Sequence, residues 1–208
     1  DRAPKVRLFK ETNSRERALT PEQAKTLLGE LPEHQREVVL FALATGLRQS
    51  NVLRLEWAQV NLEQRHAWVR GTESKNRRPI SVPLNETAMA VLQRQAGKHP
   101  TRVFTYLGKP MNSANTKAWK AALKRAEVQD FRWHDLRHTW ATWQRQAGTP
   151  THELQRLGGW RTGAMVERYA HLAPDHLAMA SSRLDSVLHT LNNPVGQNDV
   201  NPEAENDA

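Results

Sequence analysis

The chain of 208 residues is long enough for one large domain or two small ones with a substantial hydrophobic core, which excludes a peptide hormone or a marginal miniprotein. It contains 30 basic and 22 acidic residues, and because residues 192–208 hold four of the acidic residues and no basic one, residues 1–191 carry a net charge of +12. This surplus favours a polyanionic partner, most often nucleic acid, with an anionic membrane surface as the rival.

The composition also restricts the chemistry and the compartment. The chain has no cysteine, so disulfide frameworks, thiolate zinc sites and cysteine nucleophiles are excluded. No apolar run approaches the roughly 18 residues of a membrane span, and no charged start followed by an apolar stretch indicates a signal peptide. We therefore expect a soluble, cytoplasmic protein whose chemistry uses oxygen and nitrogen side chains.

The first part of the chain predicts three helices. Thr20 can cap a helix that starts at Pro21, because proline suits a first turn and Gln23 can close a capping box. A dense apolar run after Pro32 is typical of a buried core helix, and the residues after Gln49 place apolar side chains at helical spacing. We expect these helices over residues 20–29, 33–45 and 49–57.

A small antiparallel sheet follows. Three short stretches rich in β-branched and aromatic residues predict strands over residues 60–62, 67–69 and 79–84, with a cation-rich turn at residues 71–78. Helical periodicity then returns, and glycines mark several helix ends. These later helices are expected over residues 85–96, 113–126, 134–147, 151–158, 165–169 and 174–191. The pattern predicts a mainly α fold with a small antiparallel β-sheet, in the α+β class.

Two arginines lie where an anion would be held. Arg48 begins a predicted helix, where the helix dipole and free backbone N–H groups favour negative charge. His134 and Arg137 are three residues apart, so they share one face of a helix and could hold the same oxyanion. A metal site is the alternative for His134 and His138, which are four apart, but no third ligand is indicated. For each residue taken alone, a solvated side chain is the more common structure.

A lysine and a tyrosine are further candidates. Lys75 lies in the cation-rich turn with Arg77 and Arg78, where a hairpin tip can meet a nucleic-acid backbone. Of the two tyrosines, we expect Tyr106 in the core and Tyr169 on a polar helix, where its hydroxyl can face a ligand. A phenol has a pKa near 10, so it needs nearby positive charge or a base to act as a nucleophile. Arginine, lysine and histidine would supply both.

Five segments occur in an informative order. They are residues 45–51 (TGLRQSN), 74–76 (SKN), 134–139 (HDLRHT), 157–160 (LGGW) and 168–172 (RYAHL). Each is weak alone, but together they resemble the tyrosine recombinase or phage integrase family. The resemblance covers about residues 19–191 and implies the catalytic-domain fold of DNA breaking-rejoining enzymes. Residues 1–18 are then expected to be the remnant of a linker or arm, and residues 192–208 a disordered acidic tail.

The resemblance implies an enzyme that cuts and rejoins DNA through a 3′-phosphotyrosine link, with no metal or nucleotide cofactor. Tyr169 would attack the scissile phosphate and release a 5′-hydroxyl. Arg48 and Arg137 would bind the nonbridging oxygens and stabilise the transition state. Lys75 would protonate the leaving 5′-oxygen, and His134 would bind the phosphate and assist proton transfer at the tyrosine.

Two positions vary within the family. Trp160 stands where most members have histidine and some have tryptophan. Its indole N–H can donate one hydrogen bond to the phosphate and its ring can pack against the tyrosine segment, but it cannot shuttle a proton. Asn51 stands where many relatives have an acidic residue, so it offers the arginines an amide without a charge.

The implied partner is double-stranded DNA at an attachment site, with Arg77 and Arg78 on the binding surface. Recombination of two duplexes needs four active sites, so the resemblance implies a homotetramer in the synaptic complex and a monomer for the isolated domain. A directionality factor and DNA-bending accessory proteins are further expected partners. The function implied is integration or excision of a mobile element such as a prophage in the cytoplasm of a bacterial host.

Other classes share some of these features. A noncatalytic DNA-binding regulator would explain the charge, but not the ordered basic residues that accompany one tyrosine. A type IB topoisomerase has the same chemistry and acts on one duplex, whereas the composition of segments 45–51 and 157–160 favours a recombinase. A metal-dependent nuclease needs clustered carboxylates, which the sequence does not indicate.

Overall fold

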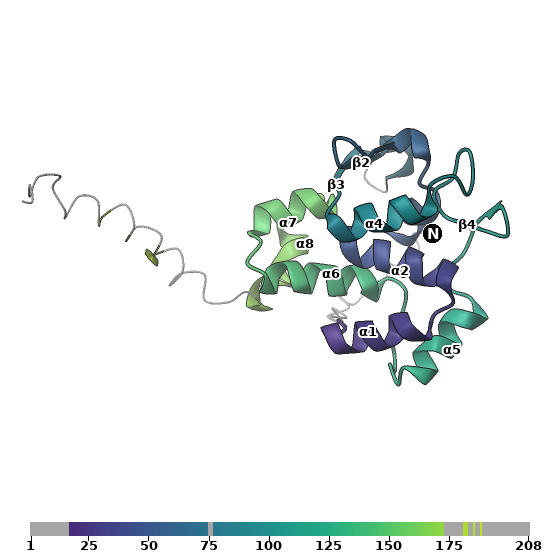
Figure 1. Ribbon diagram of the computed structural model, residues 1–208. Coiled ribbons are helices and arrows are strands. Elements are labelled where there is room, and N and C mark those ends of the chain that lie inside the picture. The colour runs from purple at the N-terminus through teal and green to yellow at the C-terminus, as the bar shows by residue number, and fades with distance from the viewer. Residues whose placement is uncertain (1–16, 75–76, 173–180, 183–184, 186–187, 189–208) are drawn as a thin grey trace, which may run out of the picture. The chain divides into compact units, whose positions relative to one another are not determined.

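The structure, a computed structural model, describes residues 17–74, 77–172, 181, 182, 185 and 188. The chain divides after Ala173 into two units, and the described part of the first unit contains every element below. This part is mainly helical with two small antiparallel sheets (Figure 1), which confirms the expected α+β class. Within the described residues, none of the helices combines the length and the apolar character that crossing a membrane requires.

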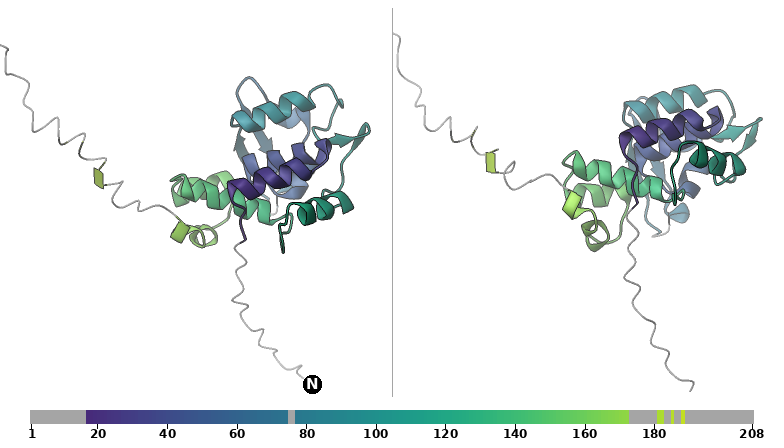
Figure 2. Two further views of the ribbon diagram at one scale, coloured as in Figure 1. Left: turned by 60° about the horizontal axis from the view of Figure 1, so that its bottom comes forward. Right: turned by 90° about the horizontal axis from the view of Figure 1, so that it is seen from below.

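The core of the first unit is built around α2 (Glu33–Thr45), which lies inside a group of helices in Figures 1 and 2. It packs against α4 and α6, and α1 packs against α2 and α5. Val38, Val39 and Phe41 of α2 are fully buried, as the dense apolar run predicts. The surrounding helices are α1 (Pro21–Glu30), α4 (Glu86–Gln95), α5 (Lys117–Arg125) and α6 (Asp135–Gln146).

Helix starts and ends follow local capping chemistry. The expected capping box of α1 is confirmed, because the Thr20 hydroxyl accepts from the Gln23 N–H and the Gln23 side chain accepts from the Thr20 N–H. The third helix is shorter than expected: α3 (Gln49–Leu53) ends before Leu55. The carbonyl of Leu55 accepts from the Val103 N–H, so the chain here is extended beside a distant segment instead of continuing the helix.

The three-stranded sheet has the expected strands in the order β1 (Val60–Asn61), β2 (His66–Val69), β3 (Ile80–Pro83), all antiparallel. Ala67 pairs with Val82 and Val69 with Ile80, and these four side chains are buried. The alternation along β2 and β3 therefore directs one face of the sheet to the core. β3 packs against α7 (Thr151–Gly158), which brings the carboxyl-terminal helices to this sheet.

Between α4 and α5 the structure differs from expectation. A hairpin of β4 (Thr105–Tyr106) and β5 (Lys109–Pro110) was not predicted, and Tyr106 is 50% exposed. The core placement of Tyr106 was therefore wrong, because its ring stacks on the side chain of His34 at the surface. The helix expected from residue 113 begins at Lys117, where the Thr116 hydroxyl accepts from the Trp119 N–H and caps it.

The last elements of the first unit are α7, α8 (Ala164–Glu167) and a 3-10 turn, η3 (Ala170–Leu172). Tyr169 was expected on a helix, but it lies between α8 and η3. A second apolar cluster holds this region together and consists of Trp140, Ala141, Leu154, Val166 and Tyr169. Most of residues 1–18, most of the helix expected over residues 174–191 and the whole of residues 192–208 lie outside the described residues.

Candidate active site

Arg137 joins three of the segments that the sequence singled out. Its Nη1 donates to the carbonyl of Gly46 at 2.7 Å, and its Nη2 donates to the carbonyl of Gly158 at 2.5 Å. The side chain comes from α6 and is 4% exposed. The guanidinium therefore holds the end of α2 and the end of α7 against α6, and both bonds are charge-assisted.

The two glycines are required by close contacts with aromatic rings. Gly46 ends α2 with φ 65°, and a Cβ on it would lie 2.2 Å from the ring of Trp140. A Cβ on Gly158 would lie 1.9 Å from the ring of Trp160. Real Cβ atoms do not approach so closely, so glycine at these positions lets the indoles pack onto the backbone whose carbonyls bind Arg137.

Trp160 covers the buried cation. The Cζ atom of Arg137 lies 4.1 Å from the centroid of the Trp160 ring, which is a cation–π geometry. The same indole stacks on Trp140, with centroids 6.0 Å apart, and is tilted against Tyr169, with centroids 6.1 Å apart. Its backbone is fixed by Gln155, whose carbonyl accepts from the Trp160 N–H at 3.0 Å. Trp160 is thus a packing centre of the site.

Arg48 brings a second guanidinium to this region. It immediately precedes α3, and its Nη1 is buried without a hydrogen-bond partner among the described residues. Burial lowers the pKa of Arg48. Burial and repulsion from Arg48 together lower the pKa of Arg137 to about 9, while Tyr169 acts in the opposite direction. An anion that contacts both arginines would stabilise their charged forms and so raise both pKa values.

Tyr169 is 2% exposed and lies against α6. Its hydroxyl is 2.5 Å from Nδ1 of His138, one helical turn beyond His134. His134 is exposed, and its ring is edge-on to the ring of His138 with centroids 5.1 Å apart. The structure therefore brings Tyr169, Arg137 and Trp160 together, and it adds His138, which the sequence argument had considered only as half of a metal pair.

Asn51 and Lys75 complete the set of candidates. Asn51 is 5% exposed, and its Nδ2 has no hydrogen-bond partner among the described residues, while its Oδ1 accepts from the Ser50 hydroxyl at 3.5 Å. The side-chain amide of Asn51 is thus a buried donor, three residues after Arg48, that has no acceptor among the described residues. Lys75 lies outside the described residues, but its neighbours Ser74 and Arg77 both line a cavity beside Trp160.

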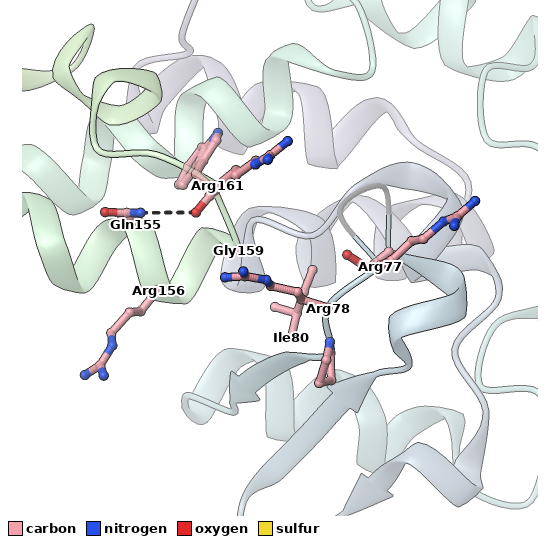
Figure 3. A pocket seen from close by; sticks show the side chains of 10 residues that line it. Arg77, Arg78, Ile80, Gln155, Arg156, Gly159 and Arg161 are labelled. Carbon is pink, nitrogen blue, oxygen red and sulfur yellow. Dashed lines mark hydrogen bonds between the residues drawn. The ribbon is translucent and has the colours of Figure 1, made fainter.

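This cavity has a volume of about 540 Å³ and lies between the start of β3 and the end of α7 (Figure 3). In Figure 3 the side chain of Arg78 extends towards Gly159, and Arg77 points the other way. Two arginines that the sequence argument missed, Arg156 and Arg161, come from the opposite wall. No acidic residue is among the lining residues, which are Ser74, Arg77, Arg78, Pro79, Ile80, Gln155, Arg156, Gly159, Trp160 and Arg161.

Several arginines elsewhere on the domain are paired with glutamates. Each of five arginines outside the cavity forms an ion pair with a glutamate; the pairs are Arg65–Glu86, Arg70–Glu56, Arg94–Glu37, Arg102–Glu56 and Arg125–Glu30. The four arginines of the cavity form no ion pair with any residue that the structure describes. Uncompensated positive charge therefore gathers at the cavity beside Trp160, as expected of a surface that receives an external anion.

Comparison with known proteins identifies the family. Residues 17–176 match the model of the phage integrase family. The chain belongs to the phage integrase family. The matched range includes every one of the five segments that the sequence singled out, and it ends close to the boundary between the two units.

Several relatives of this phage integrase family member are curated proteins. It is 46% identical to the integrase of Salmonella phage P22, over 91% of this chain and 52% of that protein. It is 31% identical to a shufflon-specific DNA recombinase of Escherichia coli, over 87% of this chain and 46% of that protein. The chain therefore spans about half the length of the curated relatives that it matches.

Solved structures place the fold in the same family. The catalytic domain of bacteriophage HP1 integrase superimposes with a TM-score of 0.62 at 26% identity, covering 86% of this chain and 98% of that one. A Tn1549 transposon integrase in complex with a circular intermediate DNA gives a TM-score of 0.66 at 21% identity, over 84% of this chain and 68% of that one. The similarity to the Tn1549 integrase shows a shared fold.

Proposed function

We propose that the chain is the catalytic part of a site-specific DNA recombinase that cleaves and rejoins strands through a 3′-phosphotyrosyl intermediate. The observation that carries this proposal is that Arg137 interacts with both the buried Tyr169 and Arg48, and that neither arginine has a carboxylate partner among the described contacts. Electrostatic interaction with Tyr169 and repulsion from Arg48 both act on Arg137, so the three groups share one environment. Such a site suits a phosphodiester.

In this reaction the Tyr169 oxygen attacks the scissile phosphorus, a new P–O bond forms, and the bond to the 5′-oxygen breaks. Arg48 and Arg137 bind the nonbridging oxygens and stabilise the extra negative charge of the pentacoordinate transition state. Lys75 protonates the departing 5′-oxygen, and His134 binds the phosphate and assists proton transfer. Rejoining reverses the bonds when a 5′-hydroxyl attacks the phosphotyrosine. No metal or nucleotide cofactor takes part.

Trp160 and the arginines of the cavity contribute in different ways. Trp160 keeps Arg137 in place, as its 4.1 Å contact with the guanidinium supports, and its indole N–H donates to the phosphate. Arg77 and Arg78, with Arg156 and Arg161, bind backbone phosphates near the scissile one, because their charges are uncompensated by described residues. These contacts position DNA without reading its sequence.

The relatives support a wider assignment. The phage P22 relative is named an integrase, and one XerH structure is described as a recombinase bound to its difH substrate. By analogy, we propose that the whole protein integrates or excises a mobile element such as a prophage at a duplex attachment site. It acts as a homotetramer in the synaptic complex, with a directionality factor and DNA-bending proteins as partners, in the cytoplasm of a bacterial host. The isolated domain is a monomer.

Covalent trapping tests the proposal. The protein is incubated with a pool of nicked suicide duplexes, denatured, and digested, and DNA-linked peptides are identified by mass spectrometry. We expect a 3′-linked adduct on the peptide that contains Tyr169, absent from Tyr169→Phe. Tyr106→Phe is the matched control, because it removes the second of the two tyrosines in the chain from the surface hairpin and keeps the adduct. An adduct that persists in Tyr169→Phe, or none in the wild-type protein, would refute the mechanism.

A further inference from the structure

The side chain that touches the oxygen of Tyr169 is His138. The two atoms, Nδ1 of His138 and Oη of Tyr169, are 2.5 Å apart, and the rings are tilted by 43° with centroids 6.0 Å apart. His138 lies on α6 immediately after Arg137, so the backbone of one helix presents both the phosphate-binding cation and this imidazole. This segment of α6 therefore contacts the Tyr169 oxygen and carries the arginine proposed to bind the phosphate.

Burial, together with nearby charges, favours the neutral imidazole of His138. Burial and the nearby His134 lower the pKa of His138 to about 4, and Arg168 and Arg137 act in the same direction, whereas Asp135 opposes them. A neutral imidazole has one donor nitrogen and one acceptor nitrogen. With a protonated phenol, the Tyr169 O–H donates to Nδ1 of this contact, and the imidazole hydrogen then resides on Nε2.

We propose that His138 is the general base of the proposed reaction and accepts the Tyr169 proton at Nδ1 as the phenol oxygen attacks the scissile phosphate. This inference rests on the proposed function. As the new P–O bond forms, the proton moves from Oη to Nδ1, and the 5′-oxygen leaves with a proton from Lys75. In rejoining, the 5′-hydroxyl returns its proton to Lys75, and His138 returns its own to the tyrosine oxygen.

The charge balance explains why this base would act only with DNA in place. In the free protein an imidazolium at position 138 is disfavoured by burial and by the cations around it, so the proton stays on the phenol. A bound phosphodiester adds negative charge beside Arg137 and His138, and this charge stabilises both cationic groups. Proton transfer is therefore coupled to substrate binding. Of the two histidines whose rings meet edge-on, His134 is the exposed one.

The test compares variants in single-turnover formation of the covalent complex. His138→Gln keeps a hydrogen-bond acceptor but cannot take up a proton, so we expect a loss of about 100-fold or more, as is usual when a general base is removed. His152→Gln is the matched control, because this histidine lies on α7 with its side chain 75% exposed, and we expect the wild-type rate. Circular dichroism and thermal unfolding confirm that the His138 variant is folded.

A fluorinated tyrosine separates proton transfer from positioning. 3,5-Difluorotyrosine at position 169 lowers the pKa of the nucleophile, so less help from a base is needed. We expect this substitution to raise the rate of covalent-complex formation in His138→Gln at least about 10-fold, and to change the wild-type rate much less. Absence of rescue, or a wild-type rate in His138→Gln, would overturn the role of His138. Both results leave the proposed function standing if the wild-type protein still forms its adduct on Tyr169.

Discussion

The guanidinium of Arg137 lies over the indole ring of Trp160, with Cζ 4.1 Å from the ring centroid. Arg137 is 4% exposed, so the indole replaces part of the water that the cation would otherwise have. A cation over an aromatic face is stabilised by the ring quadrupole, most strongly when it is desolvated. The tryptophan thus lowers the free-energy cost of keeping a buried charge in place before the proposed DNA substrate binds.

Replacement of Trp160 tests this packing role. Trp160→Ala removes the ring that contacts Arg137, Trp140 and Tyr169, so we expect the free energy of unfolding to fall by roughly 2–3 kcal/mol. Covalent-complex formation should fall by about 100-fold, as expected when a transition-state contact is lost. Trp160→His retains a flat ring and an N–H donor and should stay within about 10-fold of the wild type. Urea unfolding and suicide-duplex cleavage measure the two effects. Equal, near-complete loss in both variants would contradict the assignment.

A single methyl group on the α7 glycine provides a second test. In Gly158→Ala the new Cβ would lie 1.9 Å from the Trp160 ring, so the indole must move away from Arg137. We expect a loss of about 1–3 kcal/mol in the free energy of unfolding, as is typical of overpacking. Cleavage should fall in parallel. Gly29→Ala is the control, because a Cβ there meets nothing within 4 Å, and it should be neutral or stabilising by up to about 1 kcal/mol.

The lowered pKa of His138 predicts how the free energy of unfolding depends on pH. Its pKa is about 4 in the folded protein and near 6.5 in an unfolded chain, so between these values the unfolded chain binds the additional proton. The free energy of unfolding therefore falls as pH is lowered from 6.5 towards 4, and is unaffected by this group above that window. Because the ring is half-buried and partly screened, we expect a loss of roughly 1–2 kcal/mol.

Urea unfolding at pH 7.5 and pH 4.5 measures this dependence. The loss of unfolding free energy between the two pH values is compared for the wild type and His138→Gln. In His138→Gln the part of the acid loss that belongs to His138 should vanish. An unchanged difference between the two pH values in the variant would show that the histidine is not held neutral by its surroundings.

Salt dependence distinguishes the arginines proposed to face DNA from those that are not. Arg78→Gln and Arg161→Gln each remove a cavity cation without a described acidic partner, so each should reduce the slope of log K against log salt for duplex DNA by about 1. Arg94→Gln removes a cation that is bound to Glu37 on another face, and its slope should match the wild type. Equal slopes for all three variants would remove the cavity from the DNA-binding surface.

The sequence predicted the fold well where the signal was local. The capping box at Thr20 and the alternating strands appeared where expected, since neighbouring residues decide them. The early end of α3 and the exposed position of Tyr106 depend on partners far along the chain, residues 101–103 and His34, so no local pattern predicted them.

The same distinction applies to the site. The segments around Arg48, Arg137 and Tyr169 could be selected from their composition and order. The contact between His138 and Tyr169 spans 31 residues, and the convergence of Arg156 with Arg78 requires the packing of α7 on β3. A histidine immediately after the second arginine was visible, but only the folded chain shows which oxygen it meets.

The two carbonyls that bind Arg137 also govern when the site can form. One acceptor lies 91 residues before the arginine and the other 21 residues after it, and Tyr169 follows later still. A nascent chain that has emerged only to α6 contains Arg137 with one of its two carbonyl acceptors and still lacks Tyr169. Assembly of the site is therefore a late, nonlocal folding event, because contacts of such sequence separation form only after loop closure. Ribosome-bound fragments and prematurely terminated chains that end before Tyr169 consequently lack the nucleophile of the proposed cleavage.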